Sequence, residues 1–255
     1  MKRSAAVFTI QQDEPVFLPV WLRYYAKHYP CRDIYVLNHA LPTDLDNFFG
    51  VVRAFGAVHV GVFNDESFDH RWLLETVKRF QRFLFQSYES VLFTEVDELV
   101  MPADGSSVYD YARRDDRPLV TVSGFNVIHC IDQPAIDWDK PLLAQRKYGY
   151  HAPRYSKPLL ARRPTEWHIG FHGADGAGPA DPSLLNVHLH RIDLGYCHDR
   201  HRRASARNWS RYDRENGLGV QYHRYDHDEL TKWFYHGSDL GTGPLDIPAA
   251  IKGNV

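Results

Sequence analysis

The sequence predicts an α/β protein with a Rossmann-like, mixed and mostly parallel sheet that has helices on both faces. Two observations support this. Apolar runs alternate with amphipathic segments four times within the first hundred residues, a pattern typical of parallel strands joined by crossover helices. The chain has 255 residues, 44% of them hydrophobic, which is enough to bury one large core. We therefore expect a single domain over residues 1–255.

The first half of the chain is expected to follow the strand–helix alternation closely. The first strand is predicted at residues 5–10, an apolar run that ends in the polar turn 11–14. Residues 18–30 follow with a proline near their start and apolar side chains on one face, which predicts a helix. The same patterns predict strands at 33–40, 58–63 and 91–96 and helices at 41–57 and 70–90.

The order of elements loosens after residue 102. We expect shorter elements there, together with an arginine-rich segment at 198–214 whose arginines recur at near-helical spacing. The expected helices are 106–114 and 226–236, the strands 119–125, 157–163 and 183–191, and the irregular segments 126–157 and 241–255.

Composition narrows the functional classes. The formal net charge is −2 and both signs are spread along the chain, which does not indicate a nucleic-acid footprint or a polybasic membrane patch. The N-terminal apolar run of about six residues is too short for a signal peptide, and no stretch approaches a membrane span of roughly 20 apolar residues. Cys31, Cys130 and Cys197 are odd in number and far apart, which fits a reducing compartment. We expect a cytoplasmic protein with small-molecule partners.

An acidic turn interrupts the apolar stretch "VLFTEVDELVMP" at residues 91–102. Glu95 and Asp97 stand two residues apart at the end of a predicted strand, so both carboxylates can face the same side. A hard divalent cation such as Mn²⁺ or Mg²⁺ takes oxygen ligands of this kind. Solvated acids that end a strand are the alternative. The quick return to apolar residues after Glu98 favours the metal site.

Residues 11–44 and 91–102 together resemble the glycosyltransferases of the GT-A fold, specifically the bacterial family-two-like group. The likeness covers about the first hundred residues and continues more weakly through "SKPLLARRPTEWHIGFHG" and "LLNVHLHR". It implies a nucleotide-sugar-binding half at 1–102 and an acceptor-side half at 103–255. The implied reaction moves a sugar from a nucleoside diphosphate sugar, with UDP the expected nucleotide, to a hydroxyl of a glycan or other acceptor. Inversion at the sugar and a role in bacterial polysaccharide biosynthesis are also implied.

The resemblance also implies roles for individual residues. Asp97 would bind the metal that bridges the donor diphosphate, and Glu95 would take the first position of the Asp-x-Asp motif, where it departs from the family's Asp. One C-terminal histidine, His172 or His190, would complete the metal site. The expected nucleoside pocket consists of Gln11, Gln12, Glu14, Asn38 and Asp44.

Two further parts of the implied site are an arginine and a general base. Arg203, in the arginine-rich segment, is the candidate for binding the donor diphosphate, because guanidinium groups pair well with phosphate oxygens. A solvated helix face explains the same pattern of arginines. An inverting transfer needs a carboxylate base on the acceptor hydroxyl. Asp132 and Glu166 are the first candidates, ahead of Asp137 and Asp139.

Two rival functions use the same residues. The first is a zinc-dependent hydrolase or phosphoesterase with Asp97, His172, His188 and His190 as ligands, although the chain has no His-Glu-x-x-His motif. The second is a non-catalytic nucleotide- or glycan-binding protein that lacks the base. The sequence has no P-loop and no nucleophile elbow, so P-loop and covalent serine chemistry are not indicated.

Overall fold

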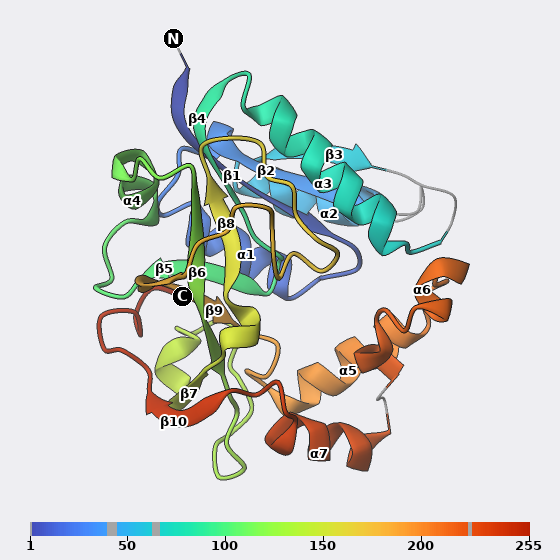
Figure 1. The fold of residues 1–255 in the computed structure, drawn as a ribbon. Helices are drawn as coiled ribbons and strands as arrows, with labels where there is room; N and C mark the ends of the chain where they lie inside the picture. Colours follow the sequence, from blue (N-terminus) through green and yellow to red (C-terminus); the bar gives the residue numbers. More distant parts are fainter. Residues whose placement is uncertain (1, 40–44, 63–66, 224–225) are drawn as a thin grey trace.

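The computed structural model describes residues 2–39, 45–62, 67–223 and 226–255. A ten-stranded mixed sheet runs through this part of the chain (Figure 1). Strands from both sides of residue 102 take part in it. They are β1 (Arg3–Gln11), β2 (Ile34–His39), β3 (Val58–Val62), β4 (Tyr88–Phe93), β5 (Glu98–Pro102), β6 (Leu119–Val127), β7 (Tyr148–His151), β8 (Lys157–Ala161), β9 (Ala180–His188) and β10 (Thr242–Asp246).

The N-terminal half is parallel and Rossmann-like. Its strands lie in the order β3-β2-β1-β4, and every pairing among them is parallel. The central strand β1 is buried from Ala5 onward, because it has a neighbour on each edge and helices on both faces. This confirms the α/β class and the strand–helix alternation predicted for this half.

The C-terminal half is mainly antiparallel, so "mostly parallel" describes only the first half of the sheet. β8 pairs antiparallel with β4, and the path continues through β6, β7 and β10 with antiparallel pairings. β9 pairs antiparallel with β5 and parallel with β6. A parallel neighbour needs a crossover connection of a dozen or more residues, usually a helix, and the described chain between β6 and β8 has β7 and short 3₁₀ turns but no α-helix.

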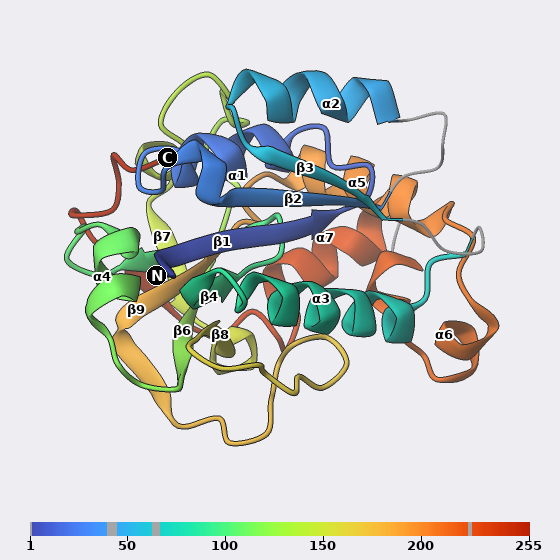
Figure 2. The same ribbon diagram turned by 90° about the horizontal axis from the view of Figure 1, so that it is seen from above.

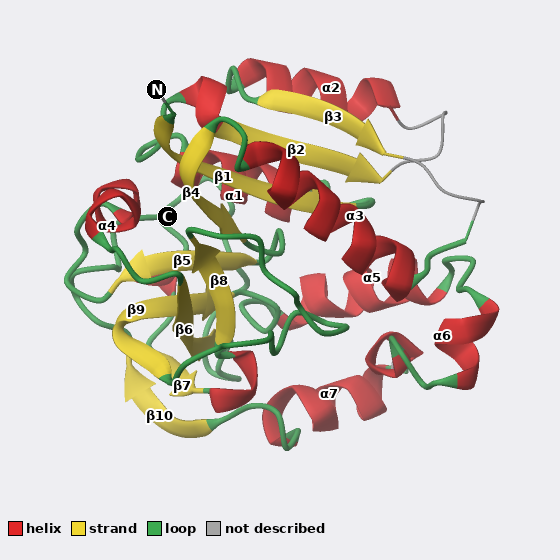
Figure 3. Ribbon diagram, turned by 45° about the horizontal axis from the view of Figure 1, so that its top comes forward, coloured by secondary structure: helices red, strands yellow, loops and turns green. Residues whose placement is uncertain are grey.

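Helices cover both faces of the parallel half. α3 packs on one face, and α1 and α2 lie on the other (Figures 1 and 2). α5, α6 and α7 gather on the side toward which β1, β2 and β3 point (Figure 3). The helices are α1 (Phe17–Tyr25), α2 (Leu45–Ala54), α3 (His70–Leu84), α4 (Val108–Arg114), α5 (Leu194–Ser205), α6 (Arg211–Glu215) and α7 (His227–His236).

Aspartates begin the three helices that border the site. Asp69 accepts hydrogen bonds from two backbone N–H groups of α3, Asp226 does the same for α7, and Asp193 accepts one from Tyr196 of α5. Each carboxylate satisfies donors that the first helical turn leaves unpaired and offsets the helix dipole. Side-chain chemistry therefore fixes where these helices start.

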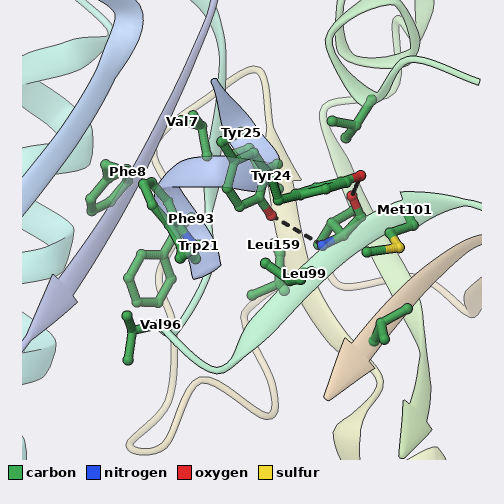
Figure 4. Close-up of a cluster of buried hydrophobic side chains, with 14 of the residues drawn as sticks. Val7, Phe8, Trp21, Tyr24, Tyr25, Phe93, Val96, Leu99, Met101 and Leu159 are labelled. Atoms are coloured by element: carbon green, nitrogen blue, oxygen red, sulfur yellow. Dashed lines mark hydrogen bonds between the residues drawn. The ribbon is translucent and has the colours of Figure 1, made fainter. Parts of the chain in front are cut away.

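Buried side chains of α1 hold the acidic turn in place. Figure 4 shows Tyr24 and Tyr25 of α1 beside Leu99 and Met101 of β5, with Trp21 beside Phe93. The Tyr24 hydroxyl donates to the carbonyl of Val100 at 2.8 Å, and the N–H of Val100 donates to Tyr25 at 3.0 Å. Trp21 donates to Thr94 at 2.7 Å. The strands on both sides of residues 94–97 are thus anchored to one buried helix.

Three expectations for the second half need correction or refinement. The segment 241–255 is not wholly irregular, because residues Thr242–Asp246 form β10 against β7. The predicted loop 126–157 contains β7, and the arginine-rich segment forms α5 and α6 with a break between them. Every residue of β10 is exposed and two of its positions are glycine or proline. The sequence therefore lacks the apolar alternation from which a strand is predicted. None of the described helices is long and apolar enough to cross a bilayer.

Candidate functional site

A cavity of about 940 Å³ opens at the carboxyl ends of β1, β2 and β4. We call it the central cavity. Its wall combines the end of β1, the acidic turn, the residues that follow β8 and β9, and one face of α7. In an open α/β sheet this is the edge where ligands bind, because loops from neighbouring strands converge there. The sequence predicted this location from the acidic turn.

Glu95 and Asp97 both line the central cavity, as predicted. They lie in a turn rather than on an extended strand, since the N–H of Glu98 donates to the carbonyl of Glu95 at 3.0 Å. The carbonyl of Asp97 accepts from the N–H of Leu189 at 2.8 Å. This bond fastens the turn to the end of β9 and brings Asp97 beside the histidines of that segment.

The Asp97 carboxylate is buried among three side chains. Its Oδ2 lies 2.5 Å from Nη1 of Arg200, 3.5 Å from Nε2 of His188 and 3.4 Å from Nδ1 of His190. Burial alone would raise the pKa of Asp97, but the charge of Arg200 outweighs it. The pKa of Asp97 is held well below its usual range, so the group is a permanent anion.

His188 presents an unprotonated nitrogen to Asp97. Asn126 donates from Nδ2 to the carbonyls of Asp239 and Leu240, and carbonyls only accept, so its Oδ1 must face His188. Oδ1 also only accepts, and it lies 2.8 Å from Nδ1 of His188. The proton of a neutral His188 is therefore on Nδ1, and the lone pair of Nε2 points toward the Asp97 carboxylate.

His190 directs the lone pair of Nδ1 to Arg200, beside the Asp97 carboxylate. Arg200 has only donors, and its Nη1 lies 2.9 Å from Nδ1 of His190, so this nitrogen accepts. Burial lowers the pKa of His190 to about 4, although Asp97 acts in the opposite direction. His190 is thus neutral at pH 7. Two imidazole nitrogens and one carboxylate oxygen converge, and the guanidinium of Arg200 donates to two of these three groups, Asp97 and His190.

These three residues fit a divalent cation. Asp97, His188 and His190 each offer a ligand atom, all within 4.8 Å of one another and all buried. Asn126 accepts a hydrogen bond from Nδ1 of His188 and so fixes the orientation of its ring, as the hydrogen-bond partners of metal-bound histidines do. His190 also belongs to a second buried group with Cys197 and His201. Because Nδ1 of His190 faces Asp97 and Nε2 faces His201 at 2.8 Å, the two groups use different nitrogens.

Glu95 is neutralised by a buried lysine. Nζ of Lys157 lies between Glu95 and Glu98, 2.7 Å from the Glu98 carboxylate. Lys157 and Glu98 are fully buried, whereas Glu95 is 40% exposed toward the cavity. Burial would raise the pKa of Glu95, but the charge of Lys157 lowers it. Burial raises the pKa of Glu98. Glu95 therefore lies at the cavity but outside the group formed by Asp97 and its histidines.

His172 reaches the cavity from a different direction. It stands on the loop after β8, where Gly170 and Phe171 both have positive φ angles of 82° and 61°. Its Nδ1 lies 2.6 Å from the carbonyl oxygen of Arg154. The protein around it and the charge of Lys157 lower the pKa of His172. The structure does not place this residue with Asp97, so its predicted role as a metal ligand lacks geometric support, whereas that of His190 has it.

The predicted nucleoside residues divide into three groups. Gln11, Gln12 and Glu14 line the cavity. Asn38 is buried behind them, where its Oδ1 accepts from Gln11, so it supports the wall and does not line it. Asp44 lies outside the described residues.

Three predicted site residues lie away from the central cavity. Asp132 is 66% exposed and faces Lys147, and Glu166 is 45% exposed and paired with Lys78 and Arg82. Neither lies within reach of a substrate held at Asp97, so neither can serve there as the base. Arg203 pairs with Asp13 at 3.3 Å, while the buried arginine at the site is Arg200. Sequence position between two motifs does not specify which face of the sheet a side chain joins.

The sequence interpretation missed Lys157 and the part played by Asn126. A lysine followed by four apolar or proline residues in "SKPLLA" was the available signal, because a lone charge in a buried strand requires a partner. Asn126 gave no such signal. Its role arises from the register of β6 and β9, which sets it opposite His188.

No family model matches this chain, and a search of curated proteins gives no match to its sequence. The functional argument therefore depends on the chemistry of the central cavity itself. Its lining includes the ionised carboxylate of Asp97, the imidazoles of His188 and His190, and five cationic side chains, which are Arg154, Lys157, Arg200, Arg207 and Lys232.

Proposed function

We propose that the protein is a metal-dependent GT-A glycosyltransferase that moves a sugar from a nucleoside diphosphate sugar to an acceptor hydroxyl, with inversion. Asp97, His188 and His190 would hold Mn²⁺ or Mg²⁺, and UDP is the nucleotide we expect. The observation that carries the proposal is the buried group of one carboxylate and two imidazole nitrogens formed by Asp97, His188 and His190. It occurs at the carboxyl edge of a Rossmann-like half-sheet, where diphosphates bind in such folds.

The charges in the cavity suit a diphosphate. Arg154, Lys157, Arg200 and Arg207 line it, and arginine forks pair well with phosphate oxygens. A divalent cation, when bound, would polarise the phosphate oxygens and stabilise the charge on the leaving group. Lys157 is shared by Glu95 and Glu98, and Arg200 is shared by Asp97 and Glu14. These four carboxylates outnumber their two cations, so an added divalent cation would offset the remaining negative charge.

The size of the cavity suits two substrates. Its volume of about 940 Å³ is near the upper end of the roughly 300–1,000 Å³ typical of ligand pockets. Gln11, Gln12 and Glu14 lie at the β1 end, and Lys232 and His236 come from α7 on the other side. A donor at the β1 end would leave room for an acceptor beside α7.

The experiment is thermal stability with UDP, GDP, CMP or dTDP, each with and without Mn²⁺. A ligand at 100 times its dissociation constant adds about 2.7 kcal/mol, enough to shift the melting temperature clearly. We expect one nucleotide to stabilise the wild type only with Mn²⁺ and to have no effect on Asp97→Asn. Asp132→Asn is the matched control, since its carboxylate is exposed and distant from the cavity. No shift with any nucleotide would contradict the proposal.

A zinc-dependent hydrolase or phosphoesterase is the second candidate. The observation that favours it is the ligand set itself, because one carboxylate with two imidazoles suits Zn²⁺ as well as Mn²⁺. It predicts that Zn²⁺ alone stabilises the protein and that a phosphate ester is hydrolysed without any acceptor. Stabilisation that requires both a nucleotide and Mn²⁺ decides against it.

A further inference from the structure

We propose that His172 is the general base that removes the proton from the acceptor hydroxyl. This inference deepens the proposed function and rests on it. It assigns the base to an imidazole rather than to a carboxylate, and it gives His172 a different task from the metal-binding residues.

The backbone holds His172 at the cavity wall through two residues with positive φ, of which Phe171 is strained. Gly170 has a φ of 82° and Phe171 a φ of 61°, and a positive φ is unfavourable for a phenylalanine. Phe171 is buried against Phe93, with ring centroids 4.7 Å apart, and against Trp167. Packing of Phe171 into the core thus maintains a backbone turn that projects the next side chain into the cavity. Strain kept in this way is a common feature of functional sites.

The ring of His172 is set up to accept a proton. Nδ1 lies 2.6 Å from the carbonyl oxygen of Arg154, which can only accept, so Nδ1 carries the ring proton. Nε2 of the neutral ring then has a free lone pair. A backbone carbonyl bound to Nδ1 fixes both the tautomer and the orientation of the ring, as the partner of a catalytic histidine must.

The free lone pair has two chemical uses, which are metal binding and proton transfer. Among the described residues, the group whose ligand atoms meet around Asp97 consists of His188 and His190 and leaves out His172. The negative charge of Glu95 favours the protonated form of His172. The Glu95 carboxylate is, however, already paired with Lys157. The geometry therefore leaves proton transfer as the task of His172.

The surroundings keep His172 neutral before it takes up a proton. Burial and the charges of Lys157 and His188 lower the pKa of His172, and Glu95 acts in the opposite direction. Tyr155 lies beside both histidines, with its ring centroid 5.8 Å from that of His172 and 4.3 Å from that of His188. The proposed base and one of the proposed metal ligands therefore pack against the same aromatic ring.

In the proposed step, the acceptor hydroxyl gives its proton to Nε2 of His172 while the hydroxyl oxygen forms a bond to the anomeric carbon of the donor. The bond from that carbon to the phosphate oxygen breaks, and the nucleoside diphosphate leaves with the electron pair. His172 then returns its proton to solvent.

The test compares His172→Gln with the matched control His168→Gln, an exposed histidine that faces Asp175 on the same loop. Release of UDP is measured from UDP-glucose, UDP-galactose and UDP-N-acetylglucosamine with methyl glycosides as acceptors. We expect His172→Gln to lower kcat by about 100-fold or more and to leave KM for the donor little changed. Stabilisation by UDP with Mn²⁺ should remain, and added imidazole should restore part of the rate of His172→Ala.

The outcomes separate the two proposals. Loss of Mn²⁺-dependent UDP stabilisation in His172→Gln would make this residue a metal ligand and overturn the base. Wild-type rates in His172→Gln would also overturn it. If none of the four nucleotides stabilises the wild type with Mn²⁺ and no UDP is released, the proposed function fails and the base fails with it.

Discussion

Arg200 donates from Nη1 to the Asp97 carboxylate at 2.5 Å and from Nε to the Glu14 carboxylate at 2.7 Å. All three side chains are buried. The protein thus supplies its own cation to the carboxylate that we assign to the metal. A metal ion and Arg200 compete for Asp97, and the binding of one must loosen the other.

The first prediction follows from that competition. Arg200→Met leaves two buried carboxylates without their cation, so the free energy of unfolding in a chelator should fall by about 3–5 kcal/mol. Mn²⁺ should recover part of the loss, and its affinity for the variant should exceed that for the wild type. Urea denaturation with EDTA and with Mn²⁺ measures both effects. Arg211→Met, whose side chain is 86% exposed, is the control and should change little.

The second prediction concerns Lys157. This lysine is buried between Glu95 and Glu98, and Glu98 has no exposure at all. Lys157→Met should lower the free energy of unfolding by about 3–5 kcal/mol, because it leaves the Glu98 carboxylate buried in the core without a cationic partner. Urea denaturation at pH 7 measures the effect.

The double variant Lys157→Met with Glu98→Gln provides the control. It removes both charges and should be clearly more stable than Lys157→Met alone. Equal stability of the single and double variants would show that the lysine acts through packing of its aliphatic chain and not through its charge.

The sequence could predict the parallel half of the fold and the position of the site. Apolar periodicity is a local signal, and it placed β1 to β4 and the helices between them. Asp97 could be identified because an acid at the end of a buried strand is conspicuous within a few residues. His190 could be identified because His188 and His190 have the spacing that places both on one side of a strand.

The partners of Asp97 could not be predicted in the same way. Arg200 lies 103 positions away from Asp97, and Asn126 lies 62 positions away from His188. These contacts depend on how β9 lies between β5 and β6, a pairing that no local pattern encodes. For the same reason Asp132 and Glu166, which had suitable positions in the sequence, lie on the surface.

The third prediction concerns pH. Burial lowers the pKa of His190 to about 4 in the native state, whereas the unfolded chain has a pKa of about 6.5. Between these values the unfolded state binds a proton that the native state does not. The free energy of unfolding in a chelator should therefore fall as the pH drops from 6.5 to 4, by on the order of 3 kcal/mol from this residue.

Denaturation curves of the wild type and of His190→Gln across this range isolate the effect. Other histidines titrate equally in both proteins, so the difference in stability between them should shrink as the pH falls. A constant difference would mean that His190 binds its proton equally in the native and unfolded states.

The fourth prediction tests whether the loop geometry sets the ring of His172. Gly170→Ala must adopt a φ of 82°, and its Cβ would lie 3.2 Å from Cδ2 of His172. We expect a loss of about 1 kcal/mol in stability from the backbone alone. The rate of UDP release with a methyl glycoside acceptor should fall at temperatures where the variant is fully folded, because the ring must move away from the new methyl group. Gly178→Ala is the matched control, since its Cβ would meet no atom within 4 Å. A Gly170→Ala protein that is destabilised but transfers at the wild-type rate would show that the backbone turn serves the fold and does not position the base.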